Sequence, residues 1–180
     1  MSGSGKEALP GHSRILAIAM TLSLVVSISS AQQGQRGQRG QGGRQGSIPS
    51  TPEAAQEQLT RLRIQFDQDS FVSQAERGNL RAIALFLTAG IPVDGFDPDD
   101  QTALMGAASN GRIEVVRRLL AEGANVNVQN NSGLTALHLA AARGYTDAVR
   151  LLLDRGANLE VRNKDDWTPL LRAALSGHLH

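Results

Sequence analysis

Few residues of this chain have the type and spacing that could support chemistry. The 180 residues include four histidines and no cysteine, so a thiol nucleophile and a metal site with cysteine ligands are both excluded. His138 could serve as a general base or a metal ligand. It stands three residues after Thr135 at the expected start of a helix, where its ring can instead join the hydrogen bonds that cap the helix. We therefore interpret His138 as a structural residue.

Two other groups of polar residues could bind a metal ion. His178 and His180 lie two residues apart, but the sequence shows no third ligand near them. Asp97, Asp99 and Asp100 could offer carboxylates to calcium, but a proline interrupts them and their spacing is not that of an EF-hand. The sequence also lacks the G-x-S-x-G and G-x-x-x-x-G-K motifs. We predict no catalytic residue, no cofactor and no metal site, and we expect that the chain is not an enzyme.

The elements that would position these residues recur with a fixed period of 33 residues. A period of this length is typical of a solenoid, in which each unit buries its apolar face only by stacking on its neighbours. The positions that recur are Gly78, Gly111, Gly144 and Gly177, then Gly90, Gly123 and Gly156, and then Thr102, Thr135 and Thr168.

One unit shows how the sequence specifies its helices. Thr135 is a favourable N-cap, and the apolar residues that follow it have helical spacing. Gly144 ends this first helix, because the left-handed conformation there is least costly for glycine. A second helix is expected over 146–154 and ends at Gly156. A polar turn then leads to Thr168, which opens the next unit.

The repeated units resemble the ankyrin repeat, whose motif reads roughly Gly-x-Thr-Pro-Leu-His-x-Ala-Ala before its second helix. The residues that carry the match in phase are 102–108, 116–127, 133–141 and 167–170. In the hairpin turn, Asp100 and Asp166 replace the glycine that Gly133 retains. The resemblance implies an all-α solenoid of helix-turn-helix units with hairpin loops, in a protein that binds other proteins. It also assigns a structural role to the histidine of the motif.

The first 31 residues have the layout of a secretory signal peptide. A positively charged start is followed by an uncharged apolar run over 15–28 and by small residues before the expected cleavage site. An uncleaved anchor is the alternative, but the run is shorter than the roughly 20 residues of a membrane span. We expect an exported bacterial protein, periplasmic or secreted, whose mature chain begins near Gln32 and keeps no stable membrane span.

A low-complexity segment separates the signal peptide from the repeats. Residues 32–51 are rich in glutamine, glycine and arginine, and we expect a flexible linker. Nucleic-acid binding is less consistent with this segment, because it has no aromatic residue on which bases could stack. We then expect a capping helix over 52–68, amphipathic from Pro52 to about Phe66, that lies on the first unit. The ankyrin units that follow are expected near 69–98, 99–131, 132–164 and 165–180, the last of them incomplete.

The charge balance gives no reason to expect a polyanionic partner. The formal net charge is +1, and removal of residues 1–31 takes away Lys6, Arg14 and Glu7, which leaves 16 basic and 16 acidic residues. We therefore expect a protein partner and no nucleic acid. The oligomeric state does not follow from the sequence.

The fourth unit has no second helix within this sequence, because only three residues follow Gly177. An apolar ledge is therefore expected at this end of the stack. Either the sequence is a fragment of a longer protein, which we favour, or another chain covers the ledge.

By the phase of the motif, the hairpin tips and the exposed side of the first helices are free of stacking and line a concave surface. The predicted protein-binding residues are Asp99, Gln101, Asn110, Asn131, Ser132, Leu134, Arg143, Asp165 and Trp167. Trp167, the single tryptophan, could anchor an interface or fold against its own loop, and both interpretations stay open. We expect a protein that mediates protein–protein interaction. The alternatives are a periplasmic stress-protection accessory and an exported effector that acts on a host protein.

Overall fold

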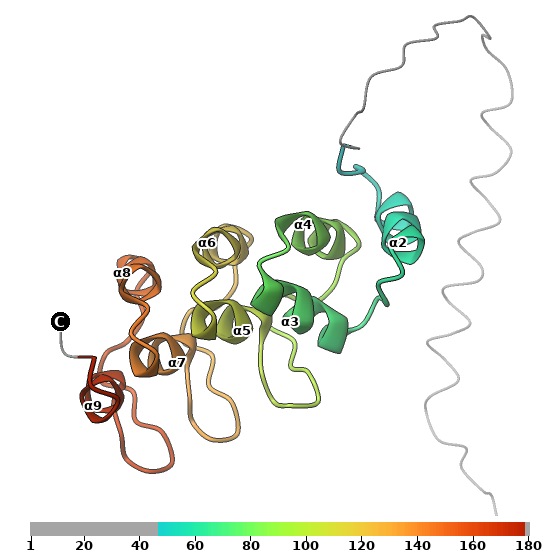
Figure 1. The fold of residues 1–180 in the computed structure, drawn as a ribbon. Coiled ribbons are helices and arrows are strands. Elements are labelled where there is room, and N and C mark those ends of the chain that lie inside the picture. The colour runs from blue at the N-terminus through green and yellow to red at the C-terminus, as the bar shows by residue number, and fades with distance from the viewer. Residues whose placement is uncertain (1–46, 179–180) are drawn as a thin grey trace, which may run out of the picture. The chain divides into compact units, whose positions relative to one another are not determined.

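Eight helices and no strand make up residues 47–178, the part of the chain that this computed structural model describes (Figure 1). The prediction of an all-α fold is confirmed. The predicted signal peptide and residues 32–46 of the predicted linker lie outside the described residues. None of the described helices has the length and apolar character that a membrane crossing requires. The helices are α2 (Pro52–Arg61), α3 (Gln68–Arg77), α4 (Leu80–Thr88), α5 (Ala103–Ser109), α6 (Ile113–Ala121), α7 (Ala136–Ala142), α8 (Thr146–Asp154) and α9 (Pro169–Leu175).

The helices after α2 form two layers (Figure 1). In the first layer α3 packs on α5, α5 on α7 and α7 on α9. The second layer holds α4, α6 and α8, and each of these also contacts the first-layer helix that precedes it. The long loops after α4, α6 and α8 extend past the first layer, on the side away from the second layer (Figure 1). This arrangement is the stack of helix pairs that the 33-residue period predicts.

The first-layer helices begin and end where the repeated residues predict. The threonines at the same position of three units are the N-caps of α5, α7 and α9, and each hydroxyl accepts a hydrogen bond from the N–H three residues on. Gly144 follows α7 with φ of +72°, in the left-handed region, where a side chain would be strained. The capping pairs are Thr102 with Met105, Thr135 with His138, and Thr168 with Leu171.

The helix α2 is shorter than the sequence predicts. The spacing of Leu59, Leu62 and Phe66 suggested a helix that continues to about residue 66, within a capping segment over 52–68. The helix ends at Arg61 instead, because Leu62 is its C-cap and Arg63 turns into the left-handed region with φ of 57°. Leu59 is fully buried, whereas Leu62 and Phe66 are exposed. The chain turns here so that Asp67 can cap α3.

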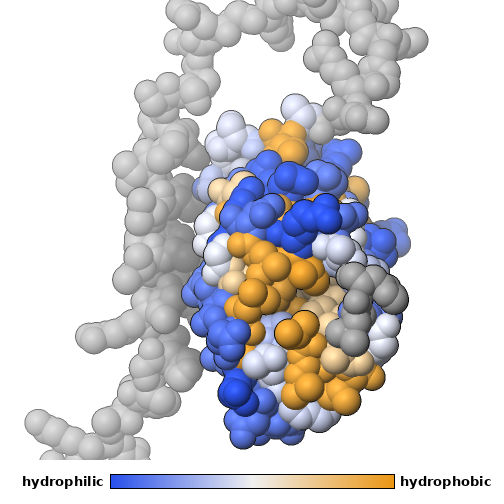
Figure 2. All heavy atoms as spheres, turned by 90° about the vertical axis from the view of Figure 1, so that its left-hand side faces the viewer, coloured by the Kyte–Doolittle hydropathy of each residue, from blue (hydrophilic) through white to orange (hydrophobic). Residues whose placement is uncertain are grey.

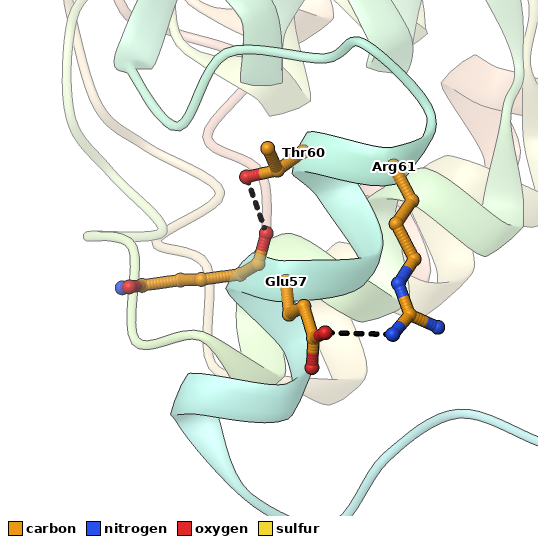
Figure 3. A network of polar contacts seen from close by, with 4 residues as sticks. Glu57, Thr60 and Arg61 are labelled. Carbon is orange, nitrogen blue, oxygen red and sulfur yellow. Dashed lines mark hydrogen bonds and ion pairs between the residues drawn. The ribbon is translucent and has the colours of Figure 1, made fainter.

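The outer face of α2 is polar, as an N-terminal cap of the stack requires. Arg61 Nη2 lies 2.6 Å from Glu57 Oε1, and the Thr60 hydroxyl donates to the carbonyl oxygen of Gln56 at 3.0 Å (Figure 3). These contacts are exposed to solvent, and such ion pairs contribute only about 0.3–0.5 kcal/mol. The stability of α2 therefore comes mainly from its inner face, where Ala55 and Leu59 are fully buried and the helix packs on α4.

A single apolar core runs through the stack from α2 to α8. At the N-terminal end Phe71 is fully buried and its ring lies 5.3 Å from that of Phe86, on which Phe66 also stacks at 5.9 Å. Gln74 is buried in a position that is alanine in later units, and its Oε1 accepts from the Asn79 side chain at 2.8 Å. The first unit therefore differs from the others because aromatic rings replace part of its packing, as expected of a terminal unit.

Candidate functional site

His138 lies in the capping network of α7. The Thr135 main-chain N–H donates to His138 Nδ1 at 3.3 Å, and the Thr135 hydroxyl lies 2.9 Å from the same atom. Because Nδ1 accepts a main-chain proton, Nε2 carries the ring proton and donates to the carbonyl oxygen of Trp167 at 3.0 Å. The ring thus ties its own helix start to the hairpin of the next unit. The structural interpretation of His138 is confirmed.

Burial also favours the neutral form of this imidazole. His138 is fully buried, and desolvation lowers its pKa below the ordinary value, although the hydrogen bond to the Trp167 carbonyl oxygen acts in the opposite direction. The Arg172 guanidinium adds a smaller lowering effect. Both ring nitrogens are hydrogen-bonded inside the protein, so the ring is not positioned to exchange a proton with a substrate.

The acidic hairpin residues also have structural partners. Asp97 Oδ1 accepts from the Gln101 N–H at 2.8 Å and closes its own hairpin. The Asp100 carboxylate accepts from the Asn131 N–H in the next hairpin. Within residues 47–178, no three histidine, aspartate or glutamate side chains gather closely enough to hold a metal ion.

Main-chain contacts hold the hairpin tips at fixed positions relative to one another. The Lys164 N–H donates to the Ser132 carbonyl oxygen at 3.0 Å, and the Asp100 carboxylate makes the corresponding link one unit earlier. Gly133 has φ of +74°, and a Cβ added there would lie 2.9 Å from the Asn163 Cα. Glycine at this position therefore allows two hairpins to approach closely. The links leave the side chains of Asn131 and Ser132 exposed.

Two predicted binding residues on the helices have contacts that the sequence did not suggest. Arg143 Nη1 donates to the Ser109 carbonyl oxygen at 2.6 Å and lies 3.4 Å from Asn110 Oδ1. The Asn110 side-chain amide donates to the Gly106 carbonyl oxygen at 2.9 Å. The expectation that these positions take no part in stacking is wrong, because the long arginine side chain reaches back by one whole unit. Both residues still present part of their surface to solvent.

Trp167 combines a fixed main chain with an accessible ring. Its N–H donates to Asn163 Oδ1 at 2.9 Å, and its carbonyl oxygen accepts from the Asn163 N–H at 3.0 Å. The Arg172 guanidinium carbon lies 6.0 Å from the ring centroid, within the range of a cation–π contact. The residue is nevertheless 38 % exposed. Sequence reasoning missed Arg172, although its place five residues after Trp167, in the last turn of α9, was a possible signal.

The predicted binding residues lie on the three hairpins, which extend past the first layer (Figure 1), and at the C-terminal ends of α5 and α7. We call this set the tip surface. Asp99, Asn131, Ser132, Arg143, Asp165 and Trp167 are exposed, and Gln101, Asn110 and Leu134 are partly exposed. The structure therefore places all nine side chains where another molecule could reach them.

Comparison with protein families finds one matching family, over two overlapping ranges of the chain. Residues 62–130 and 104–180 each match the model described as ankyrin repeats (3 copies). Together the two matches run from residue 62 to residue 180, about two thirds of the chain. A search of curated proteins found no match.

Proposed function

The chain belongs to the ankyrin-repeat family, and on that premise we propose that it binds a protein partner through the tip surface. The observation that carries this proposal is the set of links between hairpins. The Asp100 carboxylate and the Ser132 carbonyl oxygen each accept a hydrogen bond from the main chain of the next hairpin. These hydrogen bonds between hairpins therefore hold the exposed side chains of the tip surface at repeated positions, and the side chains themselves remain free to meet a partner.

Preorganisation is what makes such a surface suitable for binding. A loop that is ordered only on binding loses conformational freedom at that moment and weakens the affinity. Here Gly133 is packed against Asn163 and Lys164, so the second and third hairpins are already fixed. The side chains of Asn131 and Asp165 can then meet a partner without that ordering cost.

Trp167 is the proposed anchor of the interface. Large aromatic side chains in partly open positions dominate the energetics of many interfaces. The main chain of Trp167 is fixed by Asn163, and Leu134 occupies the same position one unit earlier and is partly exposed. These two residues would form the apolar centre of the contact, with Asp165 and Asn131 at its polar rim.

Substitution on the tip surface tests this proposal. The full chain should capture a partner from an extract of its source organism, and Trp167→Ala should reduce capture by about tenfold or more, as for an interface anchor. The matched control is Arg150→Ala, because Arg150 is exposed on α8 in the second layer. Circular dichroism establishes that both variants are folded. Capture that survives Trp167→Ala, Asn131→Ala and Asp165→Ala, or that Arg150→Ala abolishes equally, would contradict the tip-surface assignment.

We also propose that the protein is exported and acts in the periplasm or outside the cell. The support is the signal-peptide layout of residues 1–31. Expression in a bacterial host followed by cell fractionation and mass spectrometry tests it. The expected result is a processed chain beginning near Gln32 outside the cytoplasm. A full-length chain that stays in the cytoplasm would rule this proposal out and leave the tip-surface proposal untouched.

A further inference from the structure

A groove of about 440 Å³ runs along the first-layer helix α3. Each later first-layer helix packs on the one before it, but α2 packs on α4 of the second layer and not along α3 (Figure 1). The turn after α2, residues 62–65, lines one side of the groove, and five residues of α3 line the other. We call this the α3 groove, and its five helical residues are Asp69, Ser70, Ser73, Gln74 and Arg77.

Polar side chains line the α3 groove at positions that are small and apolar in the next unit. Three of these positions have buried counterparts at the junction of α5 with α3. The counterparts are Ala103, Gly106 and Ala107, one unit after Ser70, Ser73 and Gln74. A terminal surface of this stack need not be polar, because Figure 2, which views the α9 end, shows apolar residues gathered there. The lining of the α3 groove is therefore suited to a polar ligand.

Arg63 lines the groove in a conformation that arginine tolerates poorly. Its φ of 57° lies in the left-handed region, which is costly for a residue with a Cβ and is adopted most easily by glycine. The chain needs this turn in order to place Asp67 as the N-cap of α3, but the turn does not need a guanidinium. Strained residues of this kind cluster at sites that hold ligands. A ligand of the Arg63 side chain would account for the strain.

Two guanidinium groups reach the α3 groove without an acidic partner. The ion pairs of residues 47–178 lie in α2 and around α6, so neither Arg63 nor Arg77 is paired with an acid in this part of the chain. Asp69 lines the same groove but makes no ion pair with either arginine. The guanidinium fork matches the oxygens of a carboxylate or a phosphate. The groove is therefore prepared for an anion.

We propose that the α3 groove binds a small phosphomonoester that also carries hydroxyl groups, such as a sugar phosphate. A phosphomonoester has a charge of about −1.5 to −2 at pH 7. Arg63 and Arg77 together balance that charge, whereas a single carboxylate would leave one of them uncompensated. The Ser70 and Ser73 hydroxyls and the Asp69 carboxylate can then form hydrogen bonds with the hydroxyl groups of the ligand.

The size and lining of the groove favour a sugar phosphate over a nucleotide or a protein segment. Small-molecule sites have volumes of about 300–1,000 Å³, and the α3 groove lies within this range. No aromatic residue is among its described lining residues, so a nucleobase would find no ring on which to stack. Its apolar lining is confined to Leu62 and Ile64, which is little for the centre of a protein interface. No residue of the tip surface lines the groove, so the two proposals are independent.

Titration of the full chain with glucose 6-phosphate, followed by NMR of the isotope-labelled protein, tests the proposal. We expect saturable shifts of the amides of residues 62–77, and none with glucose at the same concentrations. Arg77→Ala should weaken the affinity by about tenfold or more, as for the loss of a hydrogen bond to a charged group. The matched control is Arg81→Ala, because Arg81 is exposed on α4 and does not line the groove. Circular dichroism establishes that the variants are folded.

A second substitution, Arg63→Gly, separates binding from stability. Glycine adopts the left-handed conformation without a Cβ, so the unfolding temperature should rise by about 2–4 °C. The affinity for glucose 6-phosphate should nevertheless fall by about tenfold or more. A purely structural role for Arg63 predicts the reverse, namely a lower unfolding temperature and unchanged binding, and that result would overturn the proposal.

Further outcomes would also overturn it. One is the absence of saturable shifts in residues 62–77, and another is an equal loss of affinity in the Arg81→Ala variant. A lipid headgroup is the other source of a phosphomonoester, and co-sedimentation with phosphatidylcholine vesicles that contain phosphatidic acid distinguishes the two sources. We expect no retention on these vesicles. Retention that excess glucose 6-phosphate does not release would assign the arginines to a lipid surface instead.

Discussion

Burial decides what His138 does. The ring accepts from the Thr135 main chain at Nδ1, which requires the neutral form, and it donates from Nε2 to the Trp167 carbonyl oxygen. Met105 and Leu171 hold the same position in other units, so the fold also accepts an apolar side chain there. The histidine adds a link between units that those residues cannot make.

The lowered pKa of His138 predicts a decrease in stability on mild acidification. A group whose pKa is lower in the folded state binds its proton more readily when the chain unfolds, so its contribution to stability is complete above about pH 6.5 and declines below it. We expect the unfolding temperature to fall between about pH 7.5 and 5.5, and to fall less in His138→Leu. Calorimetry of both proteins across this range measures the difference. Parallel curves would contradict the assignment of the pH dependence to this ring.

Gly133 should tolerate a side chain less well than another left-handed glycine of the chain. Gly133→Ala adds a Cβ 2.9 Å from the Asn163 Cα, whereas Gly156 has φ of +83° and nothing within 4 Å. The left-handed conformation alone costs about 1–2 kcal/mol with a side chain. We expect Gly156→Ala to lower the free energy of unfolding by about that amount and Gly133→Ala to lower it by clearly more, as measured by urea denaturation. Equal losses would mean that the hairpins are not in contact in solution.

At the scale of residues, the sequence predicted where the candidate binding residues lie better than it predicted the contacts that they make. The period places Asn131, Asp165 and Trp167 on the hairpins because every unit forms its hairpin at the same phase. It could not reveal that Arg143 donates to the Ser109 carbonyl oxygen, because that contact depends on how far a long side chain reaches across a junction. For the same reason the stacking of Arg172 on Trp167 was not foreseen.

At the scale of helices, prediction succeeded where a unit is repeated and failed where it is not. The expected bounds of α8 agree with the structure, because glycines recur on both sides of this helix, Gly144 before it and Gly156 after it. For α2 there was no second unit to supply the phase, and the helical spacing of Leu62 and Phe66 was misleading. The left-handed Arg63 and the capping of α3 by Asp67 end that helix early, and these are consequences of packing on the first unit.

The helix α2 should stabilise the first unit through Leu59. Leu59 is fully buried, and replacement of such a leucine by alanine costs about 2–5 kcal/mol. Leu59→Ala should therefore lower the free energy of unfolding and increase hydrogen exchange in α2, α3 and α4 before it does so in α7 and α8. The control is Leu62→Ala, since Leu62 is exposed three residues later. A uniform increase of exchange along the stack would argue against a local capping role.

At the scale of the whole molecule, stability depends on contacts between neighbouring units. The core is continuous from Ala55 to Leu152, but each helix pair touches only the pairs next to it and α2 touches the first. A solenoid of this kind gains stability with each junction, and its terminal faces decide solubility. The two ends of the described stack differ in this respect, because α2 covers one of them, whereas Leu170, Leu171 and Leu175 of α9 are exposed at the other.

Substitution of the same leucine of the repeat should therefore lower the free energy of unfolding by very different amounts in the middle and at the end of the stack. Leu137 is 1 % exposed and Leu170 is 67 % exposed, although both are the second residue of a first-layer helix. Leu137→Ala removes buried contacts and leaves a cavity, and should cost about 2–5 kcal/mol. Leu170→Ala removes side-chain surface that water already contacts, and should cost less than about 1 kcal/mol. Urea denaturation of both variants in dilute solution measures the ratio. A loss for Leu170→Ala as large as that for Leu137→Ala would mean that the Leu170 side chain is covered in the isolated protein.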